Sequence, residues 1–269
     1  MKLQNYFFLL TLLGIISCSK SNTDKMSAPE MNNHPNLFYQ IKTYTFDNEA
    51  QAILTESFVK NAYLPALKRQ NITNIGVFKT RLTEKDTVNK LYILLPLKSI
   101  TQVLSIEESL KTDMAYKNAG KDYLQSPFNK SPYRRIESTI LKPFDRMPFL
   151  KPSPLTGTRA NRIYELRSYE SATEEIHENK VDMFNAGGEV ALFEKLGFNA
   201  VFYGQVVSGS KMPNLMYMTT FENQTSRDAH WKAFGEAPEW NVMKSLPKYQ
   251  NNVSHIDIMY LYPTEYSDY

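Results

Sequence analysis

Four residues near the end of the sequence combine a guanidinium, an imidazole and two aromatic rings at helical spacing. Arg227, His230, Trp231 and Phe234 follow an i, i+3, i+4, i+7 pattern, which turns them toward one side of a helix. Because an ordinary imidazole has a pKa of about 6.5, His230 is a candidate general base or axial haem ligand. Two interpretations stay open: the four residues form core and rim, or they line a pocket for a flat apolar ligand.

A second group of polar residues lies on the stretch "IYELRSY" (163–169), whose period-two alternation predicts a half-buried strand. Glu165 and Arg167 fall on the same face as Tyr169, where they could form an ion pair, while Tyr164 falls on the other face. His177 opens the helical segment that follows, at the edge of its apolar face. We expect a ligand site in this part of the chain with His230 as its catalytic residue, lined by Tyr164, Arg167, Tyr169, His177, Arg227 and Trp231.

Other chemistries lack their motifs. The stretch "HENKV" (177–181) has Val181 where a zinc-protease helix needs a second histidine, so we expect no metal site. "GQVVSG" (204–209) lacks the spacing of a serine nucleophile elbow, and ten glycines form no phosphate-binding loop. With a net charge of only +3 and no basic block among aromatics, the chain is not expected to bind nucleic acid.

The only cysteine, Cys18, follows an apolar run at 6–16 that is too short to span a bilayer. Ile15-Ile16-Ser17-Cys18 resembles the bacterial lipobox, which implies a signal peptide at 1–17, cleavage before Cys18 and acylation of Cys18. The polar segment 18–36 then reads as a lipidated tether. We expect a lipid anchor in the cell envelope, in the outer membrane rather than the inner, because Ser19 is not an acidic retention signal. An ordinary signal peptide is the alternative.

The chain repeats itself. "FYQIKTY" (38–44) and "IYELRSY" (163–169) share their pattern at an offset of 125 residues, and each precedes a helical segment, a hairpin, a second helical segment and a closing strand. Each copy therefore reads β-α-β-β-α-β, the ferredoxin-like order. We expect an α+β fold of two tandem units, at 37–144 and 162–264, joined by a proline-rich linker at 145–161 and packed sheet to sheet.

"RIYELRSYE" (162–170), "HWKAFGEAPEW" (230–240) and this element order resemble the NIPSNAP family of the dimeric α+β barrel superfamily. The resemblance is strong in the second unit and weaker in the first, where Ala115-Tyr116 replaces His230-Trp231. It implies a small apolar or aromatic ligand in the second unit, with cofactor-independent monooxygenase or haem-handling activity. The alternative is a non-catalytic module held on the membrane, which binds a protein or glycan through its sheet edges or its aromatic surface. Further homodimer formation is left open.

Overall fold

The first half of the chain folds in the predicted order, with its second helical stretch broken into three pieces. The computed structural model describes residues 38–83 and 87–269, so the expected signal peptide, tether and lipidated Cys18 lie outside the described residues. Its elements are β1 (Phe38–Thr45), α1 (Glu49–Phe58), a π-helical turn (Val59–Tyr63), α2 (Leu64–Arg69), β2 (Gly76–Thr80), β3 (Lys90–Leu97), α3 (Gln102–Thr112), α4 (Met114–Ala119), α5 (Lys121–Leu124) and β4 (Arg135–Pro143).

The second half repeats that order. Its elements are a 3-10 turn (Arg159–Asn161), β5 (Ile163–Glu170), α6 (Glu174–Phe184), α7 (Glu189–Lys195), β6 (Asn199–Ser208), β7 (Asn214–Phe221), α8 (Gln224–Glu236), α9 (Pro238–Ser245), a 3-10 turn (Pro247–Tyr249) and β8 (His255–Pro263). The helix expected over about 173–196 is two helices, because Gly188 adopts a left-handed φ of 95° between them. Pro238 similarly starts a new helix after α8.

Equivalent residues begin the first helix of each half. Asn48 and Thr173, separated by the repeat offset of 125, are both N-caps: Asn48 Oδ1 accepts from the N–H of Gln51, and Thr173 Oγ1 accepts from the N–H of Ile176. Such caps satisfy N–H groups that have no partner within the helix. The repeat in sequence is therefore a repeat in local structure.

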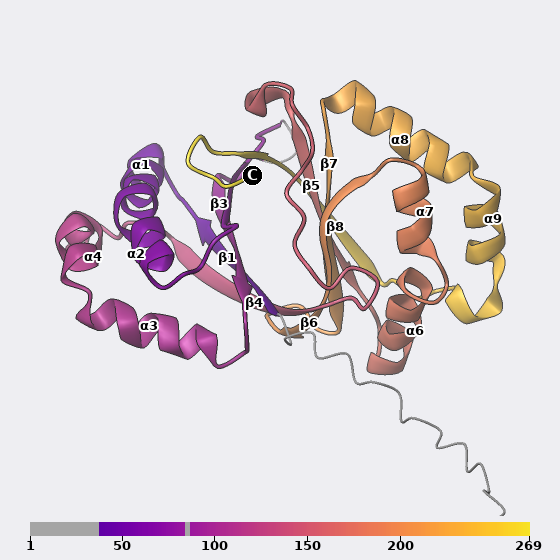
Figure 1. The fold of residues 1–269 in the computed structure, drawn as a ribbon, viewed down its shortest axis with the longest axis horizontal. Coiled ribbons are helices and arrows are strands. Elements are labelled where there is room, and N and C mark those ends of the chain that lie inside the picture. The colour runs from indigo at the N-terminus through magenta and orange to yellow at the C-terminus, as the bar shows by residue number, and fades with distance from the viewer. Residues whose placement is uncertain (1–37, 84–86) are drawn as a thin grey trace, which may run out of the picture. The chain divides into compact units, whose positions relative to one another are not determined.

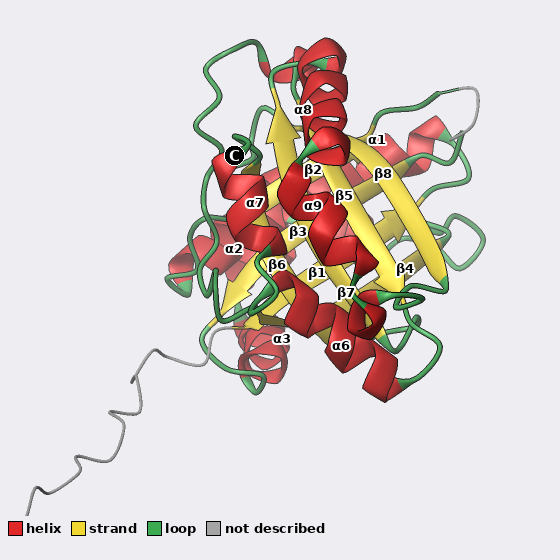
Figure 2. Cartoon of the chain, turned by 90° about the vertical axis from the view of Figure 1, so that its right-hand side faces the viewer, coloured by secondary structure: helices red, strands yellow, loops and turns green. Residues whose placement is uncertain are grey.

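The eight strands form one closed antiparallel barrel in the order β1-β3-β2-β8-β5-β7-β6-β4. Each half supplies a four-stranded sheet, and the pairs β2–β8 and β4–β6 join the two sheets. Figure 1 shows the first-half helices on one side of the strands and the second-half helices on the other, and Figure 2 shows α6–α9 lying across the second sheet. No helix of the described residues is long and apolar enough to cross a membrane.

Because every neighbouring pair of strands is antiparallel, β1 and β5, four places apart, run in the same direction. Their first residues therefore lie at one end of the barrel and their last residues at the other. At the first end, Tyr269 is buried against Phe78 with ring centroids 5.8 Å apart, and Ser267 Oγ accepts from the Val77 N–H. The tail 264–269 thus covers this end.

The barrel holds one of three hydrophobic cores. Its interior is filled by inward-facing residues of both sheets, including Tyr39, Leu94, Leu141, Tyr164 and Leu166. The other two cores lie between each sheet and its own helices. The expectation that two ferredoxin-like sheets bury their open faces against each other is confirmed, and it leaves two kinds of place for a site: under the helices or inside the barrel.

Candidate functional site at the barrel mouth

The predicted site residues divide between the two faces of β5. Tyr164 is fully buried inside the barrel, whereas Arg167 and Tyr169 face the helices of the second half. The predicted alternation of "IYELRSY" is therefore confirmed. The same alternation places Tyr164 across the sheet from the other residues expected to line the pocket, so Tyr164 cannot line one cavity together with them.

Glu165 is the centre of a buried ionic cluster under α8. The predicted ion pair with Arg167 is present, with Arg167 Nε donating to Glu165 Oε1 at 2.6 Å. Arg227 donates two further hydrogen bonds to the carboxylate, at 2.8 and 3.0 Å, and Trp231 Nε1 donates a fourth at 2.9 Å. Burial alone would raise the pKa of Glu165, but Arg227, Arg167 and Trp231 outweigh it and hold this pKa below its ordinary value.

Aromatic side chains extend this ionic cluster, one by stacking on Arg167 and two through their hydroxyl groups. The Arg167 guanidinium lies 3.7 Å from the ring centroid of Trp231 and donates to the Tyr169 hydroxyl at 2.8 Å. The Tyr169 and Tyr217 hydroxyls are hydrogen bonded to each other at 2.8 Å. Every oxygen of Glu165 is thus occupied by protein donors, which describes a structural network with its polar groups satisfied.

His230 packs into aromatic side chains. Its ring centroid lies 5.6 Å from that of Phe198 and 5.4 Å from that of Phe221, and Phe198 also contacts Trp231 at 5.0 Å. His230 Nδ1 donates to the Ser226 carbonyl at 2.6 Å. These residues do not fit a haem, since a macrocycle on His230 would have to displace the rings that pack there.

His177 lies on α6, buried and 4% exposed, and neither ring nitrogen has a hydrogen-bond partner among residues 38–83 and 87–269. Burial lowers the pKa of His177, because the charged imidazolium is disfavoured away from water. His177 is therefore a neutral core residue of the helix layer. The residues predicted under the helices thus fill that space with packed rings and ion pairs.

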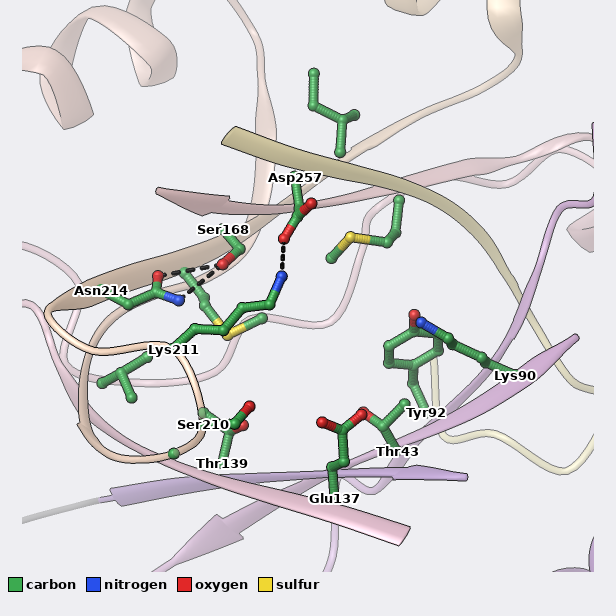
Figure 3. A pocket seen from close by; sticks show the side chains of 15 residues that line it. Thr43, Lys90, Tyr92, Glu137, Thr139, Ser168, Ser210, Lys211, Asn214 and Asp257 are labelled. Atoms are coloured by element: carbon green, nitrogen blue, oxygen red, sulfur yellow. Dashed lines mark hydrogen bonds and ion pairs between the residues drawn. The ribbon is translucent and has the colours of Figure 1, made fainter. Parts of the chain in front are cut away.

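A cavity of about 440 Å³ opens at the other end of the barrel, where β1 and β5 end (Figure 3). The two halves contribute to it at equivalent strand positions. From the first half come Thr43, Lys90, Tyr92, Glu137 and Thr139, and from the second half Ser168, Asn214, Met216, Asp257 and Met259. Val206 of β6 also lines it, and the turn between β6 and β7 adds Gly209, Ser210 and Lys211. We call this cavity the barrel mouth.

The charged groups of the barrel mouth differ between its two sides. On the second-half side, Lys211 is ion-paired with Asp257 (Figure 3). Lys211 Nζ also lies 3.7 Å from Glu170 Oε1. Burial alone would raise the pKa of Asp257, but the hydrogen bond from Lys211 helps to hold it below its ordinary value. On the first-half side, Lys90 and Glu137 have no ion-pair partner among the residues that the structure describes.

The sequence of the second half has a match among known protein families. Residues 164–268 match the model of the NIPSNAP family. The match to the NIPSNAP family covers almost all of the second half of the chain. The resemblance inferred from the sequence is thereby confirmed for this half, and no curated protein matches the chain.

Three solved structures share the architecture of both halves together. A monooxygenase-like protein from Fusobacterium nucleatum is 11% identical, aligns over 86% of this chain and 93% of its own, and has a TM-score of 0.56. One from Lactobacillus acidophilus is 10% identical over 85% and 94%, with a TM-score of 0.54. An anthrone oxidase-like protein is 11% identical over 86% and 92%, with a TM-score of 0.51. At these identities the likeness concerns the fold.

The second half also groups three metal-ligand side chains at the rim of the barrel mouth. One ligand atom each of Glu170, His255 and Asp257 lies within 4.8 Å of the others. Lys211 already places its ammonium against Asp257, and His255 Nε2 lies 3.1 Å from the other carboxylate oxygen of Asp257. The positive charge that these carboxylates need is thus supplied by Lys211.

The sequence analysis missed the barrel mouth, although a signal was present. Period-two alternation assigns Thr43 and Ser168, equivalent residues in the repeat, to the inward face of β1 and β5. Inward positions are expected to be apolar in a filled barrel, so paired polar residues at the same end of both strands mark a solvated opening. This signal can be interpreted only once the order of the strands around the closed barrel is known, and the sequence of the second half alone does not give that order.

Proposed function

We propose that the chain binds a small amphipathic molecule in the barrel mouth, with the two halves each forming one wall. The carrying observation is that ten lining residues come in five equivalent pairs around a 440 Å³ cavity. Met216, Met259 and Val206 offer apolar contact, and the rim offers hydroxyls and charges. A cavity with apolar walls and a few convergent polar groups is the usual form of a small-molecule site.

The test is native mass spectrometry of the full chain purified from its own host, compared with the same sample denatured. We expect a mass excess in the native spectrum that is lost on denaturation. Thr139→Phe, which fills the barrel mouth, should remove the excess. Lys142→Phe, three residues away on β4 and exposed outside the cavity lining, is the matched control and should keep it. A ligand retained equally by both variants would contradict the proposal.

The monooxygenase-like names of two proteins with this fold favour oxygenation by O2 as the reaction, with the protein orienting the bound molecule. His230, predicted as general base, lies on α8 in the helix layer, outside the lining of the barrel mouth. Its catalytic role therefore stays a prediction. Oxygen uptake with the retained ligand tests the reaction, and unchanged uptake by His230→Ala would remove His230 from it.

We also propose that Cys18 carries the lipid anchor predicted from its lipobox-like sequence. Two or more acyl chains give stable attachment to a membrane, whereas one holds only marginally. Cys18→Ser should move the protein from the membrane fraction to the soluble fraction of disrupted cells, and density separation of the membranes tests the expected outer-membrane location. Retention of the variant in membranes would contradict acylation.

The alternative of a non-catalytic interaction module rested on the many aromatic side chains. Most of these lie in the cores, including Tyr39, Tyr164, Tyr203 and Tyr217, and both tryptophans are half-buried. Interface aromatics act by contact with a partner and must therefore be accessible. The burial of the tyrosines favours small-molecule binding over this alternative.

A further inference from the structure

The charged side chains of the barrel mouth form an ion pair on the second-half side and, among the described residues, are unpaired on the first-half side. Lys211 and Asp257 neutralise each other across the second-half side, with a hydrogen bond between Lys211 Nζ and Asp257 Oδ2. Lys90 and Glu137, on the first-half side, remain as one cation and one anion without an ion-pair partner in the described part of the chain. Among the lining side chains of its first-half wall, a bound molecule thus meets one unpaired charge of each sign, while Arg134 and Arg135 lie with Lys90 and Glu137 in an adjoining groove.

Lys90 and Glu137 are held on either side of the same strand. Lys90 pairs with Thr45 in the β1–β3 register, and Glu137 pairs with Thr43 in the β1–β4 register. Strands two places apart in a sheet are separated by about 10 Å. Both side chains extend beside the opening in Figure 3, Glu137 next to Thr43 and Lys90 next to Tyr92. A small group between them can therefore be contacted by both.

An apolar surface lies next to these charges. Val206, Met216 and Met259 line the same cavity, and Tyr92 is buried with 5% exposure. A ligand that buries an apolar body there brings its polar end to the rim. If that end carried only one charge, either Lys90 or Glu137 would be covered without a partner, which is unfavourable.

We propose that the ligand of the barrel mouth is a zwitterion with an apolar body, of the free α-amino acid class. Lys90 binds its carboxylate and Glu137 binds its ammonium group, while the side chain of the amino acid packs on the methionines. This assignment rests on the proposed function, since it names the ligand of the same cavity. A diacyl lipid with a zwitterionic head group is a different source of the same charges, but its body is too large for 440 Å³.

The test is isothermal titration of the full chain with L-phenylalanine and with two analogues that each lack one charge, phenethylamine and 3-phenylpropionate. We expect L-phenylalanine to bind about tenfold or more tightly than either analogue. Lys90→Met should abolish its advantage over phenethylamine, and Glu137→Gln its advantage over 3-phenylpropionate. Lys142→Met, an exposed lysine on β4 outside the cavity, is the control and should leave all three affinities unchanged.

Further outcomes distinguish an amino acid from a lipid head group, and distinguish failure of the zwitterion assignment from failure of the proposed function. Glycerophosphoethanolamine carries both charges without an apolar body, and tighter binding of it than of L-phenylalanine overturns the amino acid assignment in favour of a lipid head group. Equal binding of the three phenyl compounds, or no binding of L-phenylalanine, overturns the zwitterion assignment while the native mass spectra still decide the proposed function. Binding of L-phenylalanine that survives Thr139→Phe places it outside the barrel mouth and overturns the zwitterion assignment, and the native mass spectra again decide the proposed function.

Discussion

The equivalent strands β1 and β5 show how one position in a repeat can serve two different structures. Gln40 of β1 hydrogen bonds to Ser138 at 2.8 Å, and Lys42 reaches the exposed Glu107 at 3.3 Å. At the same positions of β5, Glu165 and Arg167 form the buried cluster under α8. The fold therefore accepts two different polar pairs at these positions. In the first half the two residues make separate contacts, whereas in the second half Glu165 and Arg167 stabilise each other's charge.

Among the variants that test this comparison, Glu165→Ala should lower the free energy of unfolding the most. It leaves Arg167 and Arg227 buried without their shared carboxylate, and breaking a buried ion pair from one side costs about 3–5 kcal/mol. Gln40→Ala, the equivalent change in the first half, removes one hydrogen bond and should cost about 1 kcal/mol. Equilibrium denaturation in urea measures both, and similar losses would contradict the distinction between the halves.

Trp231→Phe compared with Tyr116→Phe is expected to give the next effect. Trp231 donates to Glu165 and stacks on Arg167, so its replacement leaves a buried carboxylate oxygen short of a donor, at about 1–3 kcal/mol. The hydroxyl of Tyr116 donates no hydrogen bond to a described residue, and the ring of Tyr116 packs on Phe58 at 5.7 Å. Tyr116→Phe should therefore change the free energy of unfolding by less than about 0.5 kcal/mol.

The acid stability of the two halves should also differ. Since the pKa of Glu165 is lowered in the folded protein, its stabilising contribution is present above the ordinary glutamate pKa of about 4.3 and is lost as the pH falls through the lowered value. Glu165→Gln should flatten the decline of stability below about pH 4. Gln40→Ala, which removes no titrating group, should leave the slope unchanged, and an identical slope in Glu165→Gln would disprove the assignment.

The smallest effect concerns His177, whose equivalent in the first half is the buried Ala52. Because burial lowers the pKa of His177, the unfolded chain takes up a proton first, so stability is complete above about pH 6.5 and declines as the pH falls below it. His177→Ala, which makes this position like the first half, should remove that part of the pH dependence. Thermal unfolding at pH 7.5 and 5.5 measures the difference between wild type and variant.

The sequence predicted what depends on nearby residues. The faces of β5 and the ion pair between Glu165 and Arg167 follow from alternation alone, and the two β-α-β-β-α-β units follow from the repeat. The donors Arg227 and Trp231 lie more than sixty residues away from Glu165 and were predicted only as members of a helix face. Their contact with the carboxylate depends on how α8 packs on the sheet, which period and spacing do not determine.

The barrel mouth was beyond the sequence for the same reason. Its walls combine Thr43 with Ser168 and Glu137 with Asp257, and each pair meets only because β2–β8 and β4–β6 close the barrel. The single predicted pocket mixed residues of both faces, since Tyr164 points inward while Arg167 points to the helices. Local pattern thus predicted the two faces of β5, whereas the cavity, which both halves line, depended on long-range strand pairing.

Because β8 closes the barrel, the barrel cannot be completed until the last strand has been synthesised. The strand β2 ends at residue 80 and its partner β8 ends at residue 263, so 183 residues (263 − 80) must be synthesised between them. At about 5–20 residues per second this takes roughly 10–40 s, during which the outer edge of β2 has no native partner. An unpaired edge is a template for pairing with another chain. The edge of β2 therefore stays open to pairing with another chain until β8 is available.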